Sequence, residues 1–117
     1  MDLKQLRARG AFIPLAPVVR TVTWTRNDEA GEPVTDTFDV HVVKHSAGSI
    51  DRLRSDAASN PDRLWGPLFL SESIRLGDDG AERLSYEDAF RLDPGLARML
   101  IDEINAVNST GEAAAKN

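Results

Sequence analysis

The sequence predicts an α+β domain: a small antiparallel sheet of two hairpins, with helices packed on one face and two consecutive helices at the C-terminal end. Two observations lead to this prediction. Residues 18–25 and 35–44 alternate between apolar and polar side chains, as half-buried strands do, whereas residues 85–108 repeat apolar side chains at helical spacing. Gly, Pro, Asn and Asp separate these segments where the chain must turn.

The first hairpin is predicted from its two alternating segments and the polar, glycine-containing connector at residues 26–33. In the first segment Val22 and Trp24 share one face, and threonines occupy the other. In the second segment Phe38 and Val40 point to the same inner face. We therefore expect an antiparallel pair with one buried face and one wet face.

Three shorter segments flank this hairpin. Residues 2–9 predict a short helix that is ordered only if Leu3 and Leu6 dock, because isolated helices of this length are marginal in water. Residues 11–17 are apolar but hold two prolines, which predicts an extended segment covering the core or a partner. A further short helix is expected from about Gly48 or Ser49, with Ile50, Leu53 and Ala57 on one side.

The most apolar stretch of the chain is LWGPLFL, residues 64–70. Since proline cannot donate a ladder hydrogen bond, a strand is predicted to begin after Pro67 and to run over residues 68–76. The sequence GDDG at 77–80 then predicts a turn into a short segment at 81–84. Together these segments predict a second, smaller hairpin.

Two helix starts stand close together near the C-terminus. Ser85 is a suitable N-cap, and Asp93 supplies a second cap with proline at the first helical position. The apolar stripe of the longer helix comprises Leu96, Leu100, Ile104 and Val107, flanked by Ala97, Met99 and Ile101. This arc is wide, so either the helix is wedged between two parts of its own domain or one shoulder binds another protein.

Composition excludes several classes of function. The chain has no cysteine, which removes disulfides, thiolate chemistry and Cys-ligated zinc. A net charge of -5 argues against nucleic acid as a partner. No apolar run approaches the roughly 20 residues of a membrane span, and no signal peptide is visible. We expect a soluble, intracellular protein with one domain at residues 1–108 and a flexible tail at 109–117.

Catalytic and cofactor motifs are likewise missing from the sequence. His41 and His45 lack the carboxylate partners of a metal site, and Asp78-Asp79-Gly80 lacks the spacing of a calcium loop. There is no P-loop, nucleophile elbow or dinucleotide fingerprint. We therefore expect no enzyme activity, no metal and no cofactor, and a binding or assembly role becomes the default.

Five segments, in their order and spacing, resemble the tail assembly chaperones of long-tailed bacteriophages and prophages. They are Leu3–Ile13 (LxxLxxxGxFI), Pro17–Thr25 (PVxRxVTWT), Phe38–Val42 (FDVHV), Leu84–Ala89 (LSYEDA) and Leu92–Asn108 (LDPxLxxxLIxxIxxVN). The resemblance implies a non-enzymatic protein of the bacterial host cytoplasm, absent from the mature virion. It would bind and solubilise the tape-measure protein and help recruit tail-tube subunits.

On this hypothesis the candidates for partner contact are Trp65, Leu68, Phe69, Met99 and Ile101. Phage chaperones of this kind often also occur as a longer, frameshifted form, and Ala115-Lys116-Asn117 is compatible with a slippery A AAA AAC heptamer. Such a form would contact the tail-tube protein, and self-association is a further open prediction. The competing hypothesis is a structural virion protein, such as a tail terminator, connector or minor tail component, that forms a ring. A small host-directed regulator is a third class.

Overall fold

The computed structural model describes residues 1–109, so the predicted tail lies outside the described residues except for Ser109. The helices are α1 (Leu3–Ala8), α2 (Ala47–Ser59), α3 (Trp65–Ser73), α4 (Tyr86–Phe90) and α5 (Pro94–Val107). The strands are β1 (Val18–Asn27), β2 (Pro33–Val42), β3 (Ile74–Leu76) and β4 (Glu82–Arg83). The predicted α+β class, the antiparallel sheet of two hairpins and the two consecutive C-terminal helices are confirmed.

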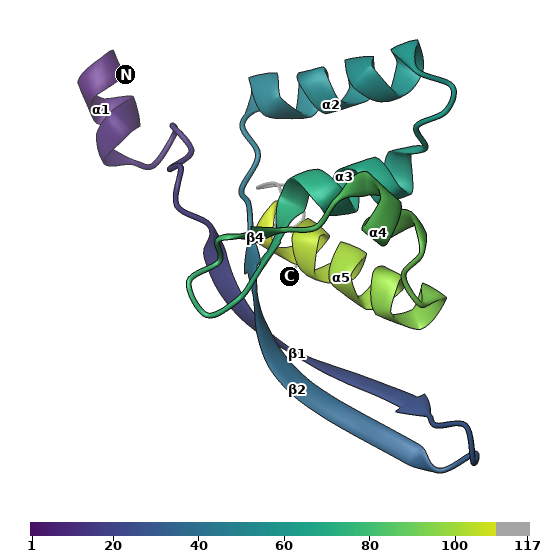
Figure 1. Ribbon diagram of the computed structural model, residues 1–117. Helices are drawn as coiled ribbons and strands as arrows, with labels where there is room; N and C mark the ends of the chain where they lie inside the picture. Colours follow the sequence, from purple (N-terminus) through teal and green to yellow (C-terminus); the bar gives the residue numbers. More distant parts are fainter. Residues whose placement is uncertain (110–117) are drawn as a thin grey trace.

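The sheet has the strand order β1-β2-β3-β4, with every neighbouring pair antiparallel. In the long hairpin Val22 stands opposite Phe38 and Val18 opposite Val42, so the apolar side chains of both strands share the inner face. Val22 and Val40 are buried there, as the alternating pattern predicted. Figure 1 shows the far half of this hairpin extending beyond the helices.

The prediction of a strand over residues 68–76 is wrong for most of its length. Residues 65–73 form α3, and only Ile74–Leu76 are extended. Pro67 lies in the first turn of the helix. Backbone N–H groups in this turn have no acceptor within the helix, so a proline there costs no helical hydrogen bond. The apolar run has no clear period because α3 is surrounded: Leu68, Phe69, Leu70, Ser71 and Ser73 are all buried.

Both predicted helix caps near the C-terminus are confirmed. The Ser85 hydroxyl accepts a hydrogen bond from the Asp88 backbone N–H at 3.1 Å, and the Asp93 carboxylate accepts one from Leu96 at 3.0 Å. On α5, Leu100 and Ile104 are buried in the core. α5 also contacts the inner face of the sheet through an ion pair. The Nε of Arg20, on β1, lies 2.7 Å from a carboxylate oxygen of Glu103.

The N-terminal helix differs from expectation. It forms with a complete capping box, in which the Asp2 carboxylate accepts from the Gln5 N–H and the Gln5 side chain accepts from the Asp2 N–H, yet it buries no residue. In Figure 1, α1 stands apart from the helical cluster and the hairpin. The radius of gyration is 16.4 Å, whereas a compact domain of this length has about 13 Å. The chain is therefore elongated, with parts extending beyond its core.

Candidate functional site

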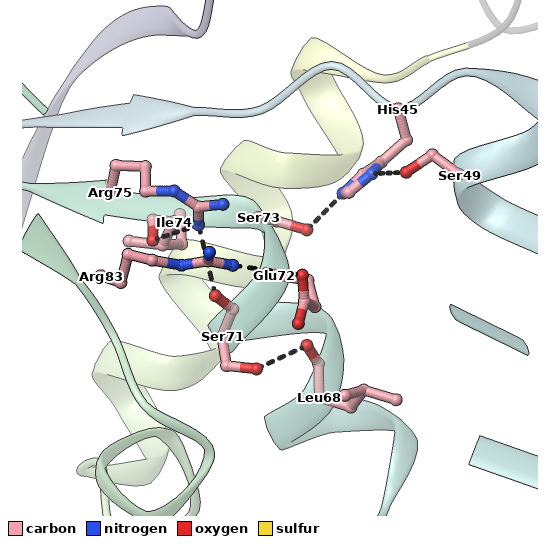
Figure 2. Close-up of polar contacts among 9 residues, drawn as sticks. All are labelled: His45, Ser49, Leu68, Ser71, Glu72, Ser73, Ile74, Arg75 and Arg83. Carbon is pink, nitrogen blue, oxygen red and sulfur yellow. Dashed lines mark hydrogen bonds and ion pairs between the residues drawn. The ribbon is translucent and has the colours of Figure 1, made fainter. Parts of the chain in front are cut away.

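A polar junction organises the region where β2, α2, α3 and α5 meet. The imidazole of His45 lies 2.8 Å from the Ser49 hydroxyl through Nδ1 and 2.6 Å from the Ser73 hydroxyl through Nε2. Figure 2 shows the ring held between these two hydroxyls, one on α2 and one at the end of α3. The neighbouring Asn108 accepts from the His45 backbone N–H at 2.7 Å and donates to the Val43 carbonyl at 3.1 Å.

The contact between His45 and Ser73 is enclosed by the core. The Ser73 side chain is fully buried, so its hydroxyl is out of reach of a substrate. Burial lowers the pKa of His45 below its usual value near 6.5; the Glu72 carboxylate opposes this shift and the Arg75 guanidinium adds to it. A neutral ring accepts from one hydroxyl and donates to the other, which satisfies both nitrogens.

Beside this junction lies a groove between α2 on one side and α3 and α5 on the other. The groove encloses about 480 Å³. Its lining combines apolar and polar side chains: His45, Ser46, Ala47, Ile50, Asp51, Arg54, Phe69, Asn105 and Asn108. The volume suits several side chains from one face of a helix, and the polar residues could orient it.

An aromatic row runs along α3 from the groove to the surface. The Trp65 and Phe69 rings are stacked, with centroids 5.0 Å apart, and Phe69 is stacked on His45 at 6.0 Å. Residues four apart lie on the same side of a helix, so Trp65 continues the groove-lining face of α3 by one turn. Trp65 is 39% exposed, and it is the accessible end of this row.

The structure separates the five residues predicted for partner contact. Leu68, only 1% exposed, belongs to the core, whereas Phe69 is buried yet lines the groove. Met99 and Ile101 are both half-buried on α5. Residues two positions apart in a helix are rotated by about 200° around its axis, so the Met99 and Ile101 side chains lie on opposite sides of α5.

The two shoulders of α5 have different neighbours. Ile101 precedes the groove residue Asn105 by one turn and so shares its side of the helix, whereas Met99 lies toward Glu103, which pairs with the sheet. The wall formed by α2 was not foreseen. Ile50 and Arg54 are four apart on a predicted helix, which places them on one face, but no local pattern indicates which helix lies opposite.

Metal-binding clusters and membrane-spanning helices are absent from the described residues. Residues 1–109 contain no group of three or more His, Cys, Asp or Glu side chains that could hold a metal ion. Within the same range, no helix combines the length and apolar character needed to cross a membrane. A larger hollow of about 660 Å³ lies on the sheet beside Val19, Phe38 and His41, but it lacks the aromatic row that adjoins the groove.

These features define an α+β domain with a long hairpin and a helical layer that holds an open groove. The family model for the phage tail assembly chaperones (TAC) matches residues 4–108, which is most of the chain. The chain therefore belongs to this family, as the resemblance implied. No curated protein and no solved structure matches the chain.

Proposed function

We propose that this protein is a non-enzymatic chaperone of the bacterial host cytoplasm that binds a helical segment of the tape-measure protein in the groove between α2, α3 and α5. The family membership supports a role in tail assembly. The groove supports the mode of binding, because an amphipathic helix buries its apolar face in such a hollow. The protein would leave before the virion is complete.

The observation that carries this proposal is the aromatic row at the groove. Partly exposed tryptophans are common anchors of protein interfaces, because they bury a large area at small entropic cost. We assign client contact to Trp65, Phe69 and Ile101, while Leu68 belongs to the core. Met99 remains a candidate on the other shoulder of α5.

Tail-tube recruitment is the second part of the proposal. The sequence-based hypothesis of a longer, frameshifted form concerns residues 115–117, which lie outside the described residues. Such a form would carry the contact with tail-tube subunits, while residues 1–108 hold the tape-measure protein. The family match favours this assembly role over a structural component of the virion.

The test is a co-purification of tagged protein with the tape-measure protein after co-expression. Trp65→Ser should lower the amount of soluble tape-measure protein at least about tenfold while leaving the chain folded, because Trp65 is 39% exposed and lies outside the hydrophobic core. Val19→Ser is the matched control, since Val19 is exposed on the outer face of the sheet, away from the groove.

Two outcomes would contradict the groove assignment. One is full recovery of the tape-measure protein with Trp65→Ser. The other is an equal loss with both substitutions, which would place the contact elsewhere or make it nonspecific. Phe69→Ser is a poor probe, because removing a buried ring costs about 3–5 kcal/mol of stability and would confuse folding with binding.

A further inference from the structure

The N-terminal arm, residues 1–17, begins with a locally ordered and fully exposed unit, residues 1–12, and continues past the end of β2, where residues 13–15 lie beside Val43 and Lys44. Its helix is capped at the N-terminus by Asp2 and closes at Gly10, whose φ is 78°. The Ala11 N–H donates a hydrogen bond to the Leu6 carbonyl at 3.0 Å. The guanidinium of Arg7 lies 5.2 Å from the centre of the Phe12 ring. Residues 2–12 of the arm are thus organised by contacts among themselves.

This ordered arm presents apolar side chains to water. Leu3 is 58% exposed, Phe12 is 52% exposed and Leu15 is entirely exposed. A helix of six residues is marginal in isolation, because few hydrogen bonds offset the cost of nucleation. Several exposed apolar groups on such a short segment are typical of a surface that another protein covers.

A second apolar surface lies at α4, with two exposed side chains on either side of Tyr86, whose ring lies 5.5 Å from the guanidinium of Arg63. This α4 patch consists of Leu64, Tyr86 and Phe90. Leu64 and Phe90 are 56% and 58% exposed. Tyr86 connects them, since its hydroxyl accepts from the Leu64 N–H at 2.8 Å and its ring lies 6.3 Å from that of Phe90.

The arm and the α4 patch have opposite charge. The arm carries three basic side chains and one acidic, whereas the rest of the chain carries eleven basic and eighteen acidic. Around the α4 patch the exposed acidic residues Asp62, Glu87, Asp88 and Asp93 outnumber Arg63 and Arg91. Attraction between such surfaces favours their encounter and sets their orientation.

We propose that the arm of one chain docks on the α4 patch of a second copy. In Figure 1, α1 stands apart to the left of the helical cluster, whereas α4 lies within the cluster toward its right side, so the arm is distant from the α4 patch of its own chain. Leu3, Leu6 and Phe12 would cover Leu64 and Phe90. Arg7 and Arg9 would face the carboxylates of Glu87 and Asp88.

This contact is heterologous, because the two surfaces that meet are different. Each copy offers one arm and one patch, so two copies exchange arms reciprocally or several copies join in a ring or filament. The α4 patch is distinct from the groove, and the inference therefore goes beyond the proposed function. A Trp65→Ser variant that fails to bind the tape-measure protein should still self-associate.

Cross-linking in trans tests the proposal directly, because the natural chain has no cysteine. Leu6→Cys and Phe90→Cys proteins, each made separately, are mixed and oxidised. The mixture should give a disulfide-linked dimer on a non-reducing gel. Replacing the Phe90→Cys protein by a Thr37→Cys protein is the control, since Thr37 is exposed on the outer face of β2 and should not cross-link.

Sedimentation gives the second measurement. The natural protein should self-associate, and Leu3→Ser with Leu6→Ser should raise the apparent Kd at least about tenfold. Arg7→Glu should weaken association, and combining it with Glu87→Arg should restore it. A natural protein that stays monomeric at about 100 μM, or a mixed cysteine pair that links no more than the Thr37→Cys control, would overturn the proposal.

Discussion

The two ends of this chain each carry an amphipathic helix, and the two helices have opposite environments. In α5 the apolar stripe is covered by the rest of the domain, with Leu100 and Ile104 buried. In α1 the leucines remain exposed, and no residue of that helix is buried. Both helices are capped by an aspartate that accepts a backbone N–H three residues later.

The comparison shows that local order and burial are separate properties. Caps and helical spacing act over a few residues, so they are satisfied in both helices. Burial of a helix face depends on tertiary contacts with residues far away in the sequence. In α5 the sheet and α3 supply it, whereas α1 receives no extensive contact from another element of the described chain. Substitutions in the two helices should therefore differ sharply.

The largest difference is expected for core side chains. Ile104→Ala should lower the free energy of unfolding by about 2–5 kcal/mol, because it removes buried methyl groups and leaves a cavity. Leu6→Ala should change it by less than about 0.5 kcal/mol in dilute protein. Urea unfolding at low concentration measures both, and equal losses would show that α1 belongs to the cooperative core.

Removal of a helix-end contact should give a smaller difference. Asn108→Ala removes hydrogen bonds to Val43 and His45 and should cost about 1–3 kcal/mol, since part-buried backbone groups lose their partner. Asp2→Ala removes the cap of α1 and should leave the unfolding midpoint unchanged while reducing the helical circular dichroism signal slightly. A shifted midpoint for Asp2→Ala would contradict the separation of the two ends.

The smallest effect is expected from pH. Because burial lowers the pKa of His45 in the folded chain, the unfolded chain binds more protons below about pH 6.5. The stability linked to this ring is therefore complete above pH 6.5 and declines as the pH falls toward the folded pKa. Urea unfolding between pH 5 and 7.5 should show this decline, and His45→Gln should make the curve flatter. Identical curves would exclude His45 as its source.

The pattern of residues predicted much of the fold. Alternation of apolar residues located the long hairpin and its inner face, and Ser85 and Asp93 located two helix starts, because these signals depend on neighbours in sequence. A strand was predicted over residues 68–76, beginning after Pro67 because proline cannot donate a ladder hydrogen bond, but residues 65–73 form α3. This helix is stabilised by burial on most sides, which depends on elements far away in sequence.

The candidate site was predicted only in part. Trp65 and Phe69 were singled out because aromatic residues beside Gly and Pro are common in interfaces, and the structure stacks their rings at the groove. Ser73 was not singled out, although its hydroxyl reaches His45 across 28 positions of sequence. Nothing in the local sequence around either residue indicates this contact.

The sequence by itself determined the extended segments of the long hairpin and the two C-terminal helices. It also determined which of their faces are apolar. Both follow because caps, turns and periodicity act between near neighbours. Only the tertiary structure decided what covers each face. Hydrophobic burial has no direction and no preferred partner in sequence, so Leu6 and Ile104 follow similar patterns. Leu6 stays at the surface and Ile104 lies in the core because the sheet and α3 pack against α5, whereas neither makes an extensive contact with α1.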